Sequence, residues 1–348
     1  MMTSKIQKIE KIFSKVTKLN QIHEATLLVE NTKGDFSYSV GYGGKDANSL
    51  LIMASITKLF TTTCILILEE QGKISLNDKL TKYFDNSILE GLHRYRGKEY
   101  SFDLTIYNLL FQTSGLPDVY EESSNSIKNS VIKEDAYIDF NEMITIVKRL
   151  KPHFAPNINK KAFYADISFD LLGEIIEKIT KLPLHQVYKK FIFEPLGLCN
   201  TYLPISEGEQ IPNIYYKNES LYRPKVIMCS RASGGCISTS KELMIFLKAF
   251  FGGKLFNEAV FRNSLSTYRK LQIFMTPIRY GCGHMQIPLG SPALFFQGKG
   301  ELVGHSGSTG SFAFYYPLKD LFFVGNVNQM AYPRIPIRLI IQLAMLIK

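Results

Sequence analysis

The sequence predicts an α/β protein of the α+β type, in which an antiparallel sheet is flanked by helices and a helical lobe stands beside it. Three observations carry this prediction. Residues of β type gather near the start of the chain, at 25–29 and 36–40. They gather again near its end, at 311–316 and 321–324. Between about 84 and 203 the patterns are mostly helical. We expect both ends to share one sheet, with the middle segment inserted beside it.

The length of the chain agrees with this division. A chain of 348 residues that is 45% hydrophobic can bury a large core in one domain or in two lobes. We expect residues 1–83 and 224–348 to form the sheet lobe and 84–223 the helical lobe, as a single catalytic unit. The cleft between the lobes is then the expected place for a site.

The chain begins with a basic amphipathic pattern. Ile6, Ile9, Phe13 and Val16 recur three to four residues apart with lysines between them, which predicts a helix. The short apolar stripe favours a helix that packs on the fold and keeps its lysines in solvent. A weak peripheral contact with a membrane surface stays open as the alternative.

The next elements follow from turn and capping residues. Asn31–Gly34 separates the first two β runs, which predicts a hairpin. A helix starts at Ser55 and ends near Gly72, which can cap it. Towards the C-terminus we expect a further β run at 293–296 and a buried helix at 339–347.

Composition excludes several classes of protein. The net charge of +10 comes from lysines spread along the chain, so no nucleic-acid partner is expected. The five cysteines show no C-x-x-C spacing, which indicates a reducing compartment without disulfides or a zinc site. The N-terminus lacks the apolar core of a secretory signal, and no segment reaches the ~18 apolar residues of a membrane span. We therefore expect a cytoplasmic protein without an integral membrane segment. The sequence contains no HExxH or DxDxDG motif, so we expect no metal or other cofactor.

Ser55 and Lys58 form the Ser-x-x-Lys motif around which the candidate site is built. On a helix the two side chains lie on one face, side by side. Serine becomes an effective nucleophile only when a base takes its proton, and a lysine can do so if burial favours its neutral form. The apolar run that follows Lys58 would supply this burial.

The same motif occurs twice more, beginning at Ser130 and at Ser238. The first copy lies in a polar segment with no apolar helix to hold it. In the second, Thr239 and Glu242 form a capping box, so its serines are expected to serve a helix end. Ser55 is therefore the expected nucleophile.

Beyond this motif, the chain resembles the serine β-lactamase-like or penicillin-recognising hydrolases, in the branch of class C β-lactamases, D-peptidases and related esterases. Three blocks carry the resemblance, at 109–117, 191–198 and 232–239, and together with the motif they cover about 25–330 in the expected order. The resemblance implies the β-lactamase/transpeptidase-like fold and a serine hydrolase activity. It also implies a substrate-binding role for Gln112 in the first block.

The second catalytic element of that family is a Tyr-x-Asn, and Tyr164 and Asp166 match its place before an amphipathic helix at 167–177. The phenol of Tyr164 can relay a proton from Ser55 to a leaving group. Asp166 departs from the usual asparagine. Its carboxylate either acts in the site, by pairing with Lys58 or repelling anionic substrates, or only caps the next helix. Both interpretations stay open.

The third element is a basic residue or histidine two positions before a glycine on an edge strand, which His305 and Gly307 match. The glycine lets the backbone approach a substrate closely, and the N–H of Ser308 would join that of Ser55 in an oxyanion hole. Family members that bind substrate carboxylates commonly have Lys-Thr-Gly here. His305 therefore argues against an archetypal β-lactamase.

The sequence thus predicts a serine hydrolase that forms an acyl-enzyme on esters or amides: an esterase, a D-amino-acid peptidase or carboxypeptidase, or a weak β-lactamase. Its partners would be small ester, amide, D-peptide or β-lactam substrates. The alternative is a non-catalytic or slowly acylating receptor or scaffold on the same fold. No G-x-S-x-G pentapeptide occurs, which argues against an α/β-hydrolase.

Overall fold

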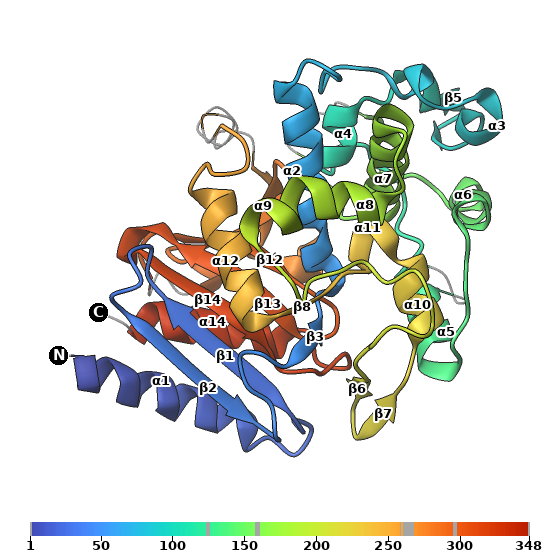
Figure 1. Ribbon diagram of the computed structural model, residues 1–348. Helices are drawn as coiled ribbons and strands as arrows, with labels where there is room; N and C mark the ends of the chain where they lie inside the picture. The colour runs from blue at the N-terminus through green and yellow to red at the C-terminus, as the bar shows by residue number, and fades with distance from the viewer. Residues whose placement is uncertain are drawn as a thin grey trace.

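A computed structural model describes residues 2–122, 126–156, 161–257, 259, 268–294 and 298–346 (Figure 1). Its main sheet has eight antiparallel strands in the order β2-β1-β14-β13-β12-β11-β10-β9. The strands are β1 (Ala25–Glu30), β2 (Ser37–Tyr42), β9 (Arg269–Lys270), β10 (Arg279–Gly281), β11 (His284–Pro288), β12 (Glu301–Ser306), β13 (Ser311–Tyr316) and β14 (Leu321–Asn326). Because β1 pairs with β14, the two ends of the chain share one sheet, as the sequence predicted.

Helices cover this sheet. Strand β14 is buried at all six positions, and successive side chains of a strand point to opposite faces, so both of its faces are covered. Helix α12 (Ser240–Phe251) packs on β1, β13 and β14, whereas α14 (Arg334–Leu346) packs on β12 and β13. Helix α1 (Met2–Thr17) packs on α14.

The apolar stripe of α1 settles one of the open alternatives. Ile9, Ile12, Phe13 and Val16 are all buried, with exposed fractions of 9% or less. The first helix is therefore packed on the fold, and its apolar face is not free to enter a membrane surface. This corrects the alternative of a peripheral contact through that face.

A lobe of short and medium helices stands beside the sheet. Its members are α2 (Thr57–Glu70), α3 (Asn86–Leu89), α4 (Ile106–Leu110), α5 (Ile127–Lys133), α6 (Phe140–Arg149), α7 (Ile167–Thr180), α8 (Leu184–Tyr188), α9 (Glu194–Leu196), α10 (Pro224–Cys229) and α11 (Arg231–Gly234). Helix α7 packs on α2, α4 and α11. Figure 1 shows α2 running from this lobe down to the sheet. The lobe boundaries given above remain a prediction.

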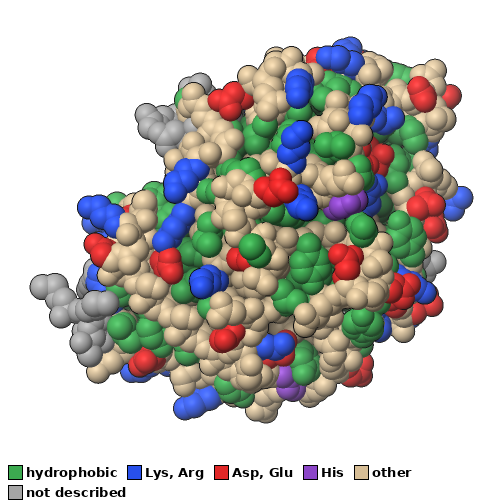
Figure 2. All heavy atoms as spheres, in the orientation of Figure 1, with side chains coloured by type: hydrophobic (Ala, Val, Ile, Leu, Met, Phe, Trp, Pro, Cys, Tyr) green, Lys and Arg blue, Asp and Glu red, His purple; other side chains and the backbone are tan. Residues whose placement is uncertain are grey.

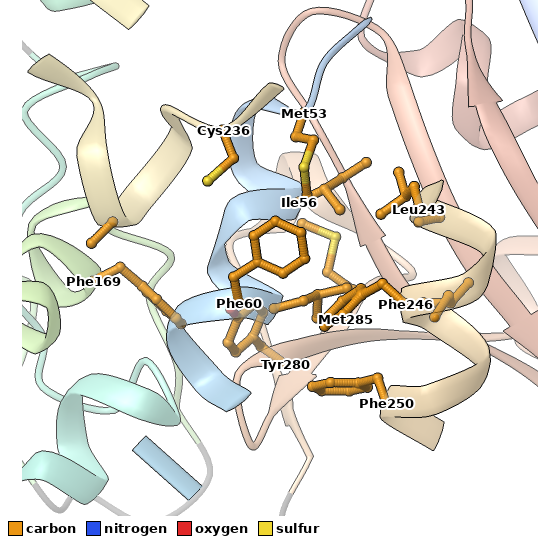
Figure 3. Close-up of a cluster of buried hydrophobic side chains, with 14 of the residues drawn as sticks. Met53, Ile56, Phe60, Phe169, Cys236, Leu243, Phe246, Phe250, Tyr280 and Met285 are labelled. Carbon is orange, nitrogen blue, oxygen red and sulfur yellow. The ribbon is translucent and has the colours of Figure 1, made fainter. Parts of the chain in front are cut away.

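Helix α2 is held by aromatic packing from both sides. The ring of Phe60 meets that of Phe246 on α12 edge-on, with centroids 4.5 Å apart, and that of Phe193 at 5.3 Å. Figure 3 shows Phe60 between Phe246 on one side and Phe169 of α7 on the other. Edge-to-face pairs add to the burial of apolar area, so the start of α2 is fixed relative to both lobes.

Short strand pairs lie outside the main sheet, and one of them links the lobes. Strand β3 (Leu50–Ile52), just before α2, pairs with β8 (Ile237–Thr239), just before α12. The other two pairs are β4 (Arg94–Tyr95) with β5 (Lys98–Glu99), and β6 (Ile214–Tyr216) with β7 (Glu219–Leu221). The β3–β8 pair ties the segment before the candidate nucleophile to the start of a sheet-covering helix.

Most predicted elements are present, with two corrections. The hairpin of β1 and β2 is confirmed, and so is the end of α2 at Gly72, whose φ is +66°. Only half of the capping box forms: Thr239 accepts from the Glu242 N–H, but the Glu242 carboxylate accepts from the N–H groups of residues 199 and 200. The β run expected at 293–296 is wrong at its start, because 292–294 form a 3₁₀ turn. Its last two residues lie outside the described residues.

Charges of both signs and free thiols are distributed over the described part of the chain. Figure 2 shows basic and acidic side chains interspersed on the face that it presents. The five cysteines are all free thiols. Among the described residues, no helix is long and apolar enough to cross a membrane, and no group of three or more His, Cys, Asp or Glu side chains is placed to hold a metal ion.

Candidate active site

Ser55 lies in a strained turn at the entrance of α2. It is the middle residue of a 3₁₀ turn, Ala54–Ile56, that runs directly into the helix. The preceding Ala54 has a φ of +46°. This backbone conformation is unfavourable in free energy for any residue that has a side chain. Two hydroxyls hold this turn from the sheet: Ser311 donates to the Met53 carbonyl at 2.8 Å, and Thr309 to the carbonyl of residue 52 at 3.1 Å. The segment that leads into Ser55 is thereby held against the β12–β13 turn.

Lys58 is completely buried and fully bonded to its surroundings. Its Nζ donates to Oδ1 of Asp166 at 2.6 Å and to the Ser233 carbonyl at 2.6 Å. The same nitrogen lies 5.0 Å from the ring centroid of Tyr164. Since Lys58 has an exposed fraction of 0% and the Asp166 side chain 23%, the ion pair is only partly shielded from water.

This contact decides what Asp166 does. Helix α7 follows Asp166, but the carboxylate makes no capping hydrogen bond to it. The side chain points to Lys58 instead. The structure shows the pairing with Lys58 that one interpretation expected and no side-chain cap hydrogen bond, whereas a role of Asp166 in binding or catalysis remains a prediction.

Tyr164 completes the group around Ser55. Its Oη is buried and has no hydrogen-bond partner among the described residues. Burial, followed by the charge of Asp166, raises the pKa of Tyr164, whereas the neighbouring Ser55 hydroxyl lowers it. The phenol is therefore neutral at ordinary pH, lies beside the nucleophile and retains an unused donor.

Two glutamines fix the backbone on which Tyr164 sits. Gln112, with a φ of +55° and no exposed surface, accepts from the Ala165 N–H at 3.0 Å and donates to the Ala165 carbonyl at 3.1 Å. Gln272 does the same for Tyr164 itself, with both hydrogen bonds at 3.2 Å. The side chain of Gln112 is committed to this backbone, and its predicted substrate contact remains a prediction. The sequence carried no signal for Gln272, a single glutamine in a loop.

His305 lies on β12 behind Tyr164, with ring centroids 6.0 Å apart. Its Nδ1 is 2.8 Å from the Ser306 carbonyl, so this nitrogen carries the hydrogen. Burial, followed by the charge of Lys58, holds the pKa of His305 well below its usual range. The imidazole is therefore neutral, and its buried Nε2 has no partner among the described residues. His305 supplies no positive charge to the site.

Gly307 allows the strand turn to touch the nucleophile turn. A Cβ at this position would lie 2.4 Å from the Met53 carbonyl oxygen and 2.9 Å from the Cβ of Ala54. Only glycine permits this close approach of the two turns. Burial raises the pKa of Tyr120 and the Ser308 hydroxyl opposes it, which places these two side chains next to each other.

Two further carboxyl groups surround Lys58, and the sequence analysis missed both. Asp118 is 4% exposed, and its Oδ1 accepts from the N–H of Asp166 at 3.2 Å. Burial, then the charge of Asp166, raises the pKa of Asp118 well above its usual range. The same two causes raise the pKa of Asp170, one turn further along α7, to about 7. The proximity of Asp118 to the 109–117 block and the four-residue step from Asp166 to Asp170 were the available signals.

The structure thus separates the three Ser-x-x-Lys copies. Ser55 is joined by the buried lysine, by Tyr164 and by the glycine turn. Ser130 lies on the short helix α5. Ser238 lies on β8, where its hydroxyl is 2.8 Å from that of Thr201.

Comparisons with known proteins show the family of the chain. A family model described as Beta-lactamase matches residues 21–343. Protein flp of Staphylococcus aureus (strain N315) is 29% identical over 208 residues, which are 56% of this chain and 38% of that protein. A Putative D-alanyl-D-alanine carboxypeptidase of Salmonella agona (strain SL483) is 28% identical over 170 residues, 48% of this chain and 37% of that protein. The matches thus span less than half the length of these relatives.

A solved structure extends the likeness to the whole fold. The D-stereospecific amidohydrolase from Streptomyces sp. superposes with a TM-score of 0.74 and 22% sequence identity, covering 95% of both chains. The β-lactamase/transpeptidase-like fold is confirmed by this match together with the family model.

Proposed function

Since the chain belongs to the Beta-lactamase family, whose members are serine hydrolases, we propose that it is a serine acyl-transfer hydrolase of esters or amides with Ser55 as its nucleophile. The observation that carries the proposal is the convergence of Ser55, Lys58 and Tyr164 from two elements far apart in the chain. A buried lysine and an unpartnered buried phenol beside a serine are the groups that move protons during acyl transfer.

The proposed reaction begins when Ser55 Oγ attacks the substrate carbonyl carbon. The Lys58–Tyr164 pair takes the hydroxyl proton when it has itself first lost one proton to solvent, and the same pair returns the serine proton to the leaving alcohol or amine. The C–O or C–N bond of the substrate breaks and an ester with Ser55 remains. Water then attacks this acyl-enzyme, its proton takes the same route, and the acid product leaves.

The oxyanion of each tetrahedral intermediate would be held by the N–H groups of Ser55 and Ser308. Gly307 supports this assignment because it brings the two turns into contact. Each such donor typically contributes about 3 kcal/mol of transition-state stabilisation.

The charges of the site favour substrates without a carboxylate next to the scissile bond. The one cation at its centre, Lys58, is already paired with Asp166, and His305 is neutral. Neither is available to bind a substrate carboxylate, which would also face the charge of Asp166. Neutral esters and amides, including those of D-amino acids, are therefore proposed ahead of carboxypeptidase substrates and β-lactams. The amidohydrolase named above supports the amide class.

The Lys58–Asp166 ion pair also supports a second candidate, a slowly acylating receptor or scaffold. A lysine whose Nζ is engaged with a carboxylate is less free to take the proton of Ser55, so acylation could be slow enough that binding is the function. Turnover distinguishes the two functions, because an enzyme releases the acyl group and a receptor does not.

The test is a panel of a nitrophenyl ester, a D-alanyl-D-alanine peptide and a chromogenic cephalosporin, assayed with the native chain and with Ser55→Ala. The proposal expects hydrolysis of the ester that disappears in Ser55→Ala, with weaker or no turnover of the two carboxylate substrates. Ester hydrolysis that survives in Ser55→Ala would overturn it. Stoichiometric acylation without turnover would favour the receptor.

The free thiols support a reducing compartment, for which we propose the cytoplasm.

A further inference from the structure

The loop between β9 and β10 carries the most exposed large apolar side chains among the described residues. Ile273 is 92% exposed and Phe274 is 66% exposed. Both lie in a 3₁₀ turn, Ile273–Met275, at the far edge of the main sheet. Two adjacent apolar side chains that project into water indicate a contact surface more strongly than single exposed ones. We call Ile273 and Phe274 the apolar tip.

Three cations lie in a row next to the apolar tip. Arg279 of β10 is directly opposite Lys270 of β9, and Lys270 is in turn opposite Lys161 through an isolated bridge. Residues directly opposite each other share a face of the sheet, with Cβ atoms about 5 Å apart. The neighbouring Tyr280 points into the core, as Figure 3 shows, so Arg279 and its partners lie on the outer face.

This cation row costs the folded chain stability as it stands. Like charges directly opposite each other in a sheet are destabilising. Within the described ranges, none of these three side chains forms an ion pair, and neither does the adjacent Arg269. The segment 268–283 contains no Asp or Glu that could offset them. An anionic partner would offset the repulsion.

The surface is connected to the candidate active site. Gln272, the residue before the apolar tip, makes both hydrogen bonds to the backbone of Tyr164. Tyr280 of β10 packs its ring edge-on against that of Tyr164, with centroids 5.7 Å apart. Whatever docks at the apolar tip therefore lies beside the catalytic group.

We propose that the apolar tip and the cation row together dock this chain on an anionic lipid surface. Apolar side chains that enter the boundary between headgroups and acyl chains, flanked by lysine and arginine, are the pattern of peripheral membrane binding. An acidic protein would need a preformed apolar pocket that matches the two projecting side chains, whereas a lipid surface accepts them wherever they meet it. The docked chain presents the Tyr164 side of its site to the lipid surface. This binding is independent of whether Ser55 is catalytic.

The test is flotation of the native chain with vesicles of phosphatidylglycerol and phosphatidylcholine, compared with vesicles of phosphatidylcholine alone. Binding is expected with the anionic vesicles only, and it should fall as salt is added. Lys270→Gln with Arg279→Gln is expected to weaken binding about fivefold per charge removed. Ile273→Ser with Phe274→Ser is expected to weaken it about tenfold or more.

Two controls separate docking from misfolding. Ile205→Ser with Leu318→Ser removes apolar side chains that are 63% and 54% exposed elsewhere, and should bind like the native chain. Lys270→Gln removes a like-charge contact, so its melting temperature should equal or exceed that of the native chain. The proposal is overturned if the native chain does not float with anionic vesicles, or if the tip variant floats as well as the native chain. It is also overturned if the apolar tip instead joins two copies in solution and no lipid binds.

Discussion

Lys58 and Asp166, which are 108 residues apart in the chain, form an ion pair of 2.6 Å in which the lysine is fully buried. An asparagine at position 166, as the resemblance led us to expect, would leave this lysine without a counter-charge. The carboxylate pairs with Lys58, and its charge adds to burial in raising the pKa of Tyr164.

Asp166→Asn is therefore expected to move the rising limb of the pH–rate profile to lower pH. The sign follows from Tyr164, because removing the negative charge of Asp166 makes it easier for the phenol to lose a proton. A shift of about one pH unit or more in kcat/KM for a nitrophenyl ester is expected. Asp103→Asn, which breaks a surface pair with Lys79, is the control and should leave the profile unchanged. A profile for Asp166→Asn that stays in place or moves to higher pH would contradict this role.

The raised pKa of Asp170 leads us to expect that the free energy of unfolding depends on pH. Its pKa is raised to about 7 in the folded chain, so the folded state binds the proton more tightly than the unfolded state does. The stability that Asp170 contributes is present in full at pH values below the pKa that this side chain has in the unfolded chain. It is lost as the pH rises through about 7. The loss is on the order of 4 kcal/mol.

Asp170→Asn should remove that loss. Its free energy of unfolding, measured with denaturant, is expected to fall less than that of the native chain between pH 4 and pH 8. The exposed Asp85→Asn should keep the native pH dependence. If the free energy of unfolding of Asp170→Asn changes with pH in parallel with that of the native chain, Asp170 does not bind the proton as proposed.

Gly307→Ala tests the contact between the two turns. The new Cβ would meet backbone atoms of Met53 at 2.4 Å, and backbone cannot move aside as a flexible side chain can. We expect a loss of about 1–3 kcal/mol in the free energy of unfolding and a loss of ester hydrolysis that exceeds it. Gly208→Ala, where only the Ser206 hydroxyl lies within 4 Å, is the matched control. Unchanged hydrolysis by Gly307→Ala would remove the argument for an oxyanion hole at Ser308.

Gln272→Leu tests whether the glutamine pair positions Tyr164. The two hydrogen bonds to the Tyr164 backbone are lost while the volume is nearly kept. A misplaced proton-transfer group lowers the rate of chemistry more than binding, so kcat should fall about 10- to 100-fold with little change in KM. Gln71→Leu, at the exposed end of α2, should match the native chain. An effect of Gln272→Leu confined to KM would indicate that the loop contacts substrate instead.

Local patterns in the sequence were enough for most of the elements and for the proximity of Ser55 to Lys58. Ser55 and Lys58 are three residues apart, so helical geometry alone brings them together. The hairpin before them and the strands near the C-terminus follow from alternation and turn residues. Tyr164 needed the family resemblance, because its contact with the start of α2 spans more than a hundred residues.

The features that the sequence could not provide depend on orientation or on long-range contact. Asp166 is followed by a helix in either interpretation, and only the direction of its side chain separates a cap from an ion pair. Gln272 reaches Tyr164 across 108 residues from an irregular loop. The positive φ of Ala54 leaves no mark on residue type, since the hydroxyls of Thr309 and Ser311 stabilise it from the other end of the chain.

The central claim is that Ser55 alone among the motif serines is an activated nucleophile. Its most direct test is mass spectrometry of the native chain after incubation with a fluorophosphonate. The account predicts one adduct on the peptide that contains Ser55, none on those that contain Ser130 or Ser238, and no adduct at all in Ser55→Ala. A folded native chain that remains unlabelled at Ser55, or that is labelled at another serine instead, would contradict the account.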